Sequence, residues 1–203
     1  DIECCFAHSL SADNSSRNTS FIKDLKDWSR IAKHIFIWDY AENWRGFMTP
    51  YPNINALGSN IQTFMKYKVM GVFEGGQNLS YGSDFEELKS WLIGKLLWNP
   101  YQNTEFLARQ CIKDYYGSSS QEILQYYNLY NSLVKPDVHI GCRLKNESEF
   151  YNDDFVKKAY PIMERAEKAA SDSVILERVK KVKLQVLASE YALHPQNFYK
   201  SGK

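Results

Sequence analysis

Strand-like and helix-like segments alternate along the first half of this 203-residue chain, and no other feature constrains its fold as strongly. Short segments dense in apolar, β-branched and aromatic residues are typical of strands, and longer segments with apolar residues at helical spacing are typical of amphipathic helices. The strand-like segments are 2–7, 34–40 and 69–73, and the helix-like segments are 21–33, 54–66 and 84–98. This order predicts an α/β fold with a parallel sheet.

Three strands cannot close a barrel by themselves. We therefore expect the first half to be either the last three β/α units of a (β/α)8-type barrel or part of an open sheet. In both folds the functional side chains gather at the carboxyl ends of the strands. Ser20 and Asp84 precede helical segments in the sequence, and we expect them to cap two of the helices.

The chain changes character from about residue 101 onward, where only helical periodicity is found. Gly117, Pro136 and Asp172 supply breaks or caps between the predicted helices. These helices cover 104–115, 119–134, 148–170 and 171–193. We therefore expect a partial (β/α) barrel over residues 1–100, an α-helical region over residues 101–203, and a helix-rich fold overall.

The charge balance and hydropathy argue against nucleic-acid and membrane partners. The 25 Lys and Arg residues against 24 Asp and Glu residues give a formal net charge of +1, without the basic excess of a nucleic-acid-binding protein. No apolar run approaches the roughly 20 residues of a membrane span. Aromatic residues make up 15% of the chain, and such rings suit cores, interfaces and sugar sites alike.

The cysteines fit neither a zinc pattern nor an evident disulfide framework. Cys4 and Cys5 are adjacent, which disfavours a bridge between them, and neither Cys111 nor Cys142 completes a CxxC pair. The histidines, aspartates and glutamates also form no cluster with metal-ligand spacing. We expect free, buried thiols, with one disulfide as the alternative, and we expect neither a metal nor a cofactor.

Two carboxylates stand where predicted strands end. Asp39 follows the second strand-like segment, and Glu74 follows the third and is itself followed by two glycines. Glycosidic cleavage needs two carboxyl groups that flank the bond, so these two residues are the predicted catalytic pair. The alternatives are that Asp39 caps its loop and that Glu74 forms a salt bridge within the sheet.

The residues around Asp39 predict a sugar-binding surface. Trp38, Tyr40 and Trp44 could stack on a sugar ring, and Glu42 could accept hydrogen bonds from its hydroxyl groups. His8, at the end of the first strand-like segment, is a further candidate for substrate binding. The alternative interpretation is that the rings pack in the core and that His8 is a satisfied hydrogen-bonding residue.

Several short motifs in a fixed order resemble the carboxyl-terminal part of an uncharacterised bacterial domain family that is described as glycoside-hydrolase-like or α-glucuronidase-like. The resemblance covers about residues 2–135. The motifs are Cys4-Cys5-Phe6-Ala7-His8, Leu25-Lys26-Asp27-Trp28, Trp38-Asp39-Tyr40, Pro50-Tyr51-Pro52-Asn53, Gly71-Val72-Phe73-Glu74-Gly75-Gly76, Lys95-Leu96-Leu97-Trp98-Asn99-Pro100 and Tyr115-Tyr116-Gly117.

The resemblance implies the last three strands of a (β/α)8 barrel followed by a helical region, acting on carbohydrate as part of a secreted, periplasmic or cell-surface bacterial protein. By position it assigns sugar-site roles to Asp39, Tyr40 and Glu74. In hexosaminidase-like relatives the catalytic acid lies on an earlier strand, so hydrolysis by this part of such a protein stays an open question.

Three functions therefore remain open at this stage. The first is that the chain is a portion of a glycoside hydrolase, and the second is that it binds carbohydrate without catalysis. The third is that it is a structural scaffold whose strand-end residues only pack. The scaffold would bury Trp38, Tyr40 and Trp44 completely. A further expected partner is a second copy of the chain, joined through an exposed sheet edge.

Overall fold

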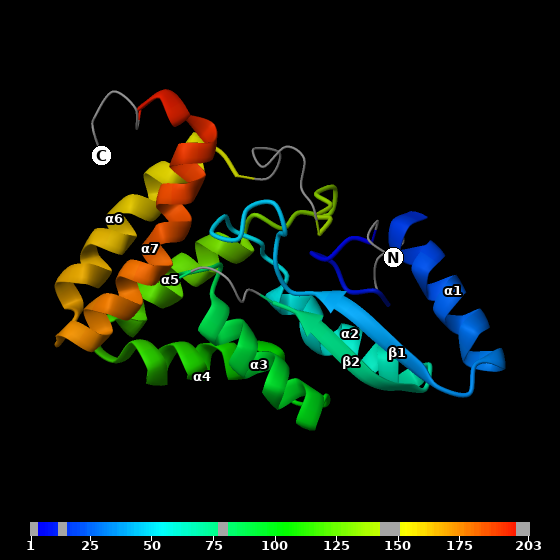
Figure 1. Ribbon diagram of the computed structural model, residues 1–203. Helices are drawn as coiled ribbons and strands as arrows, with labels where there is room; N and C mark the ends of the chain where they lie inside the picture. Colours follow the sequence, from blue (N-terminus) through cyan, green and yellow to red (C-terminus); the bar gives the residue numbers. More distant parts are fainter. Residues whose placement is uncertain (1–3, 12–15, 77–80, 143–150, 198–203) are drawn as a thin grey trace.

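The computed structural model describes residues 4–11, 16–76, 81–142 and 151–197, and within them it is rich in helix. The strands and helices of the first half are α1 (Ser16–Ile31), β1 (Ile35–Tyr40), α2 (Ile54–Lys66), β2 (Val69–Gly75) and α3 (Glu86–Trp98). The second half contains α4 (Thr104–Tyr116), the short 3-10 helix η1 (Gly117–Ser119), α5 (Ser120–Asn131), α6 (Asp153–Ala169) and α7 (Ser173–Leu193). In Figure 1, α1 and the strands form one end of the molecule and α5–α7 form the other.

The sheet consists of β1 and β2, which run parallel. Ile37 and Val72 are register partners, and both pack with Phe64 of α2 in a small apolar cluster beneath the sheet. On the opposite face, Trp38 and Phe73 are register partners and are 63% and 58% exposed. One face of the sheet is therefore covered by helices, and the other is an open apolar surface.

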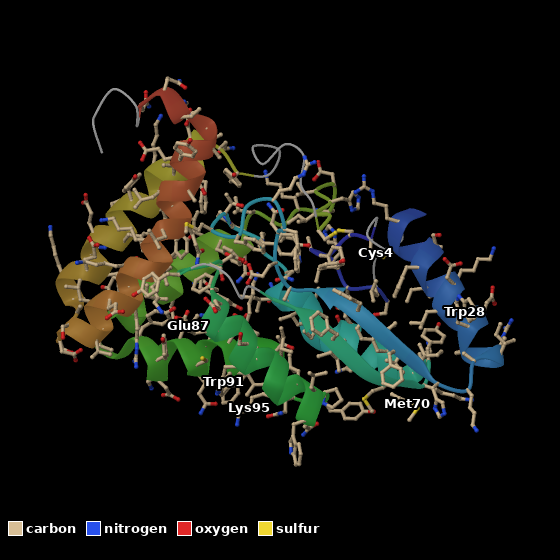
Figure 2. All side chains as sticks on the ribbon, viewed as in Figure 1. Cys4, Trp28, Met70, Glu87, Trp91 and Lys95 are labelled. Atoms are coloured by element: carbon tan, nitrogen blue, oxygen red, sulfur yellow. The ribbon has the colours of Figure 1, made fainter. Side chains whose placement is uncertain are left out.

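Met70 extends this open surface toward the end of the sheet that is farthest from the helical region, as Figure 2 shows. Each strand also has one edge without a strand partner among the described residues. Association of two copies through such an edge stays a prediction.

The first strand-like segment does not form a strand in the residues that the structure describes, so the expectation of a strand over 2–7 is wrong for 4–7. Asn18 of α1 bonds both backbone groups of Cys5, accepting from its N–H at 2.8 Å and donating to its carbonyl at 3.1 Å. Phe6 N–H donates to the carbonyl of Ile140 at 2.8 Å. These partners satisfy the backbone without a ladder to β1. Residues 2 and 3 lie outside the described part.

The core helices of the first half form where the periodicity predicts them, and α2 covers the predicted residues 54–66 in full. The predicted caps are wrong. Ser20 lies inside α1, which begins at Ser16. Asp84 stands one residue before Phe85, whose φ of 46° places it in the left-handed region at the start of α3. The Asp84 side chain instead pairs with Lys89 inside the protein.

The predicted helices of the second half are present, with capping side chains at Asn103, Asn152 and Asp172. The larger hydrophobic core includes residues on both sides of residue 100, among them Leu92 of α3 and Tyr126 of α5. No helix in the described residues is long and apolar enough to cross a membrane. Cys4, Cys5 and Cys111 are free thiols, as expected, with Cys4 and Cys5 buried and Cys111 half-buried, and Cys142 is also buried.

Candidate functional site

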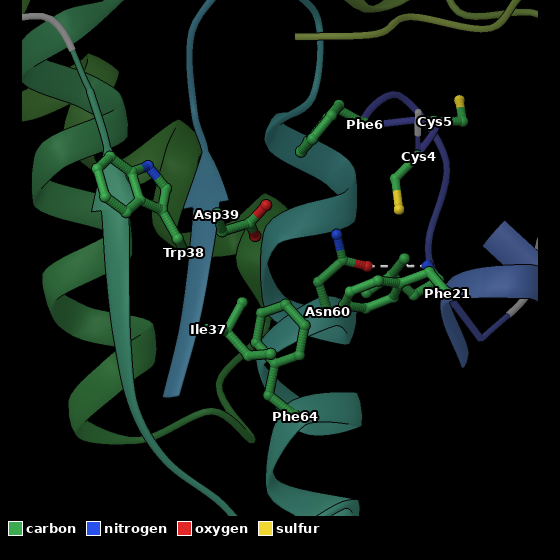
Figure 3. Close-up of a pocket in the computed structure, with 10 residues that line it drawn as sticks. Cys4, Cys5, Phe6, Phe21, Ile37, Trp38, Asp39, Asn60 and Phe64 are labelled. Atoms are coloured by element: carbon green, nitrogen blue, oxygen red, sulfur yellow. Dashed lines mark hydrogen bonds between the residues drawn. The ribbon is translucent and has the colours of Figure 1, made fainter. Parts of the chain in front are cut away.

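Asp39 and Glu74 are direct register partners at the carboxyl ends of β1 and β2. Side chains alternate along a strand, so Asp39 shares the helix-covered face of the sheet with Ile37, and Glu74 shares it with Val72. Figure 3 shows Asp39 and Trp38 leaving β1 in opposite directions. The two predicted catalytic carboxylates are therefore neighbours on one face, as the strand order predicted, but they line two different spaces and not one common opening.

Asp39 lines a small enclosed space beside the amino-terminal segment. The space has a volume of about 20 Å³ and is lined by residues that include Cys4, Phe6 and Asn60 (Figure 3). This is enough room for about one water molecule. Burial raises the pKa of Asp39 to about 6, and a hydrogen bond of 2.9 Å from the Tyr40 N–H opposes that shift. The carboxyl group is therefore mostly ionised at neutral pH.

Glu74 faces a larger cavity, of about 300 Å³, between the loop that follows β1 and helix α3. Burial raises its pKa to about 8, and the nearby charge of Asp39 adds to the shift. Its Oε2 atom is buried without a hydrogen-bond partner, and it forms no salt bridge among the described residues. The side chain is thus a carboxylic acid at neutral pH, held next to open space.

Glu42 lines the same cavity as Glu74. It is only 2% exposed, and its Oε2 atom also has no hydrogen-bond partner among the described residues. Burial raises its pKa to about 8; the Lys89 ammonium lowers that value, whereas Asp84 and Glu86 raise it. The structure therefore joins a predicted binding residue to a predicted catalytic residue in one cavity.

Lys89 is a part of this site that the sequence interpretation missed. Its ammonium group lies inside the protein and donates to Asp84 Oδ2 at 2.6 Å, to the Ala41 carbonyl at 2.9 Å and to the Tyr51 carbonyl at 3.0 Å. All three protons are therefore used, and Asp84 neutralises the charge. The available signal was a lysine on the apolar face of α3, next to Leu88.

Tyr130 of α5 is a further hydrogen-bond partner of Asp84. Its hydroxyl lies 2.7 Å from Asp84 Oδ2 and 2.6 Å from the carbonyl of Tyr51, and the Tyr51 N–H donates to Asp84 Oδ2 at 3.1 Å. The buried ion pair is thus tied to the loop after β1, to α3 and to the helical half of the protein. Lys89 lines the cavity that holds Glu42 and Glu74, so the ion pair supports one wall of that cavity.

The aromatic candidates form a chain of ring contacts. Trp38 contacts Phe73 at 4.9 Å between centroids, Tyr40 contacts Trp38 at 6.5 Å, and Trp44 contacts Tyr40 at 5.8 Å. Trp38, Tyr40 and Trp44 are all at least partly exposed. A structural scaffold was expected to bury all three rings completely. Trp38 lies mostly on the open face of the sheet, although it also lines the small space beside Asp39. None of the three rings lines the cavity that holds Glu42 and Glu74.

His8 lies apart from both carboxylate cavities. Its Nδ1 atom is 3.3 Å from Cys5 Sγ, its Nε2 atom is 3.1 Å from the carbonyl of Lys135, and its ring packs edge-on against His139. The ligand atoms of Cys5, His8 and His139 all lie within 4.8 Å of one another. This group combines residue types that can hold a metal ion, and the sequence spacing did not indicate it.

Comparison with known families gives one match. The model of a domain of unknown function matches residues 1–128, which include all of the candidate site residues except His139 and Tyr130, the hydrogen-bond partner of Asp84. No curated protein and no solved structure matches the chain.

Proposed function

The chain belongs to that family, DUF4838, and we propose that it forms part of a glycoside-hydrolase-like protein that acts on glycans. In this proposal the first half corresponds to the end of a (β/α)8-type barrel in a secreted, periplasmic or cell-surface bacterial protein. Two features support it: the parallel pairing of β1 with β2 across a connecting helix, and the carboxylates at the ends of both strands.

The observation that carries the proposal is the pairing of two carboxyl groups with different acidities. Asp39, with a pKa of about 6, and Glu74, with a pKa of about 8, are register partners on neighbouring strands. Adjacent parallel strands lie about 4.8 Å apart, which puts such a pair near the separations of about 5 to 9.5 Å used by glycosidases. At neutral pH one group is therefore an ionised carboxylate and its neighbour a protonated acid.

These acidities assign a role to each group. Glu74 donates its proton to the oxygen of the scissile bond, because it is the group that stays protonated at pH 7. Asp39 provides the second carboxylate, and the space beside it accommodates one water molecule. Glu42 lines the cavity next to Glu74 and accepts hydrogen bonds from sugar hydroxyls. The cavity of about 300 Å³ is at the lower end of the range for small-ligand sites.

The test is release of the chromophore from a panel of aryl glycosides by the full chain. Glu74→Gln and Asp39→Asn should each lower turnover by about 10²- to 10⁴-fold, the usual contribution of an acid or base. Glu164→Gln, on the exposed surface of α6, is the matched control and should leave turnover unchanged. Turnover that persists in both site variants would remove the two carboxylates from the mechanism.

A second candidate function is carbohydrate binding without catalysis, and the exposed ring chain favours it. Trp38, Phe73 and Trp44 offer contiguous aromatic surface on the open side of the sheet, where a sugar ring could stack. In that case Trp38→Ala should abolish oligosaccharide binding in a calorimetric titration, whereas Glu74→Gln should retain it. Absence of both binding and turnover across the panel would contradict both functions.

A further inference from the structure

We propose that Cys5, His8 and His139 form a binding site for a thiophilic divalent cation of the Zn²⁺ type. None of the three residues lines the cavity that holds Glu42 and Glu74, whereas Cys5 also lines the small space beside Asp39. The site lies where the amino-terminal segment meets the loop between α5 and α6. It is independent of the glycan proposal.

The distances are close to those of a coordination shell. The three ligand atoms lie within 4.8 Å of one another, and Cys5 Sγ is 3.3 Å from His8 Nδ1. Around a tetrahedral Zn²⁺, with bonds of about 2.3 Å to sulfur and 2.0–2.1 Å to nitrogen, ligand atoms are separated by about 3.4–3.6 Å. The Cys5–His8 distance of 3.3 Å already matches this separation, and the ligand atoms that lie up to 4.8 Å apart must approach by about 1.2–1.4 Å to close on an ion.

The surroundings of His8 orient it as a ligand. Its Nε2–H donates to the carbonyl of Lys135 at 3.1 Å, which leaves the lone pair of Nδ1 directed toward Cys5. A hydrogen bond from the outer ring nitrogen to a backbone carbonyl is the usual way in which proteins fix the tautomer of a metal-bound histidine. The same contact attaches the amino-terminal segment to the α5–α6 loop.

The other two ligands are also held in place. Asn18 bonds both backbone groups of Cys5, which is 1% exposed, and the Phe6 N–H donates to Ile140, the neighbour of His139. His139 Nδ1 is buried and has no hydrogen-bond partner among the described residues. Coordination through this atom would give it one. An unpaired buried nitrogen is costly, so it marks a place where a ligand is expected.

The ligand chemistry selects the class of metal. A thiolate with two imidazoles favours Zn²⁺ and its relatives over Mg²⁺ and Ca²⁺, which prefer oxygen ligands. Binding converts the Cys5 thiol into a metal-bound thiolate and releases one proton to solvent, with no change in oxidation state. Three protein ligands leave a fourth position for a water molecule or another small ligand.

The experiment is metal titration of the full chain after treatment with a chelator. With Co²⁺, binding of one equivalent should produce thiolate-to-cobalt charge transfer in the near ultraviolet together with visible bands of tetrahedral cobalt. Zn²⁺ should displace the Co²⁺ and bleach both signals. Competition against a chromophoric chelator then gives the Zn²⁺ affinity.

Two variants and two matched controls make the result specific. Cys5→Ser should remove the charge-transfer signal, and His139→Ala should weaken Zn²⁺ binding by at least about tenfold. Cys111→Ser and His34→Ala, which change a cysteine and a histidine outside the group, should match the unsubstituted protein. Circular dichroism checks that each variant is folded, and His139→Ala serves as the test should Cys5→Ser unfold.

Two results would overturn the proposal. One is the absence of saturable one-to-one binding of Co²⁺ and Zn²⁺ to the unsubstituted chain. The other is a charge-transfer signal that survives in Cys5→Ser or that disappears in Cys111→Ser, because the thiolate would then come from another residue.

Discussion

Two sets of buried carboxyl groups lie side by side at the carboxyl end of the sheet, and their partners differ. Asp84 accepts hydrogen bonds from Lys89, Tyr51 and Tyr130, and its charge is neutralised by an ammonium group at 2.6 Å. Glu42 and Glu74 each keep a buried oxygen that has no hydrogen-bond partner in the described part of the chain, and both have a raised pKa. Burial is thus accompanied by a structural ion pair at Asp84, whereas at Glu42 and Glu74 it raises the pKa of the carboxyl groups.

The position of the Lys89 ammonium explains why the two sets of carboxyl groups differ. Lys89 lines the cavity that holds Glu42 and Glu74, and it gives all of its hydrogen bonds to Asp84 and to two backbone carbonyls. Its effect on Glu42 is a weaker long-range attraction, which does not offset burial. Burial therefore keeps the pKa of Glu42 and Glu74 raised, because the ammonium of Lys89 is already paired with Asp84.

The largest expected effect comes from removing that ammonium. Lys89→Met leaves the Asp84 charge buried without a counter-ion, so the free energy of unfolding should fall by about 3–5 kcal/mol. Urea denaturation followed by circular dichroism measures this change. Lys158→Met is the control, because Lys158 pairs with Asp154 on the surface and its loss should cost less than about 1 kcal/mol. Equal costs for the two variants would contradict the structural role of the pair.

An intermediate effect is expected in the pH dependence of stability. Unfolding restores the ordinary pKa of Glu42 and Glu74, 4.5, whereas the folded state holds them near 8. Between these values the folded state binds more protons than the unfolded state, so the free energy of unfolding should decrease as pH rises through this window.

Glu42→Gln and Glu74→Gln should each reduce that decrease by about 1–3 kcal/mol between pH 5 and pH 9. Denaturation curves at several pH values provide the measurement, and the exposed Glu164→Gln variant should follow the unsubstituted protein. A stability that rises over this range, with no difference between variants, would show that the two glutamates are not buried acids.

The smallest expected effect is a shift in the titration of Glu74 when its neighbour loses its charge. The Asp39 carboxylate helps to raise the pKa of Glu74, so Asp39→Asn should lower that pKa by about one unit or less. Carbon-detected NMR of the Glu74 carboxyl group follows the titration. An unchanged Glu74 titration would mean that the two register partners do not interact.

Local patterns predicted much of the fold. Helix α2 and the two paired strands appear where periodicity and β-branched residues indicated, because those segments bury an apolar side against their immediate neighbours. The segment at 4–7 is also apolar but does not form a strand. Its backbone partners are a side chain of α1 and a loop near residue 140, which no local pattern reveals.

The candidate site was predicted only in part for the same reason. Strand position was sufficient to pair Asp39 with Glu74, since neighbouring parallel strands end together. The approach of Glu42 to Glu74, the pairing of Asp84 with Lys89 and the convergence of Cys5 with His139 all depend on chain folding over long distances. Composition and spacing carry no signal for such contacts.

The hydrogen bonds of Tyr130 have a consequence for where this protein can be cut. The family match ends at residue 128, inside α5, whereas the hydroxyl that holds Asp84 and the Tyr51 carbonyl is two residues further on. A fragment trimmed to the shared region would therefore lack a bond that supports its own cavity wall. The end of the family match and the end of the segment that supports the cavity wall are therefore different. Tyr130, near the end of α5, belongs only to the second.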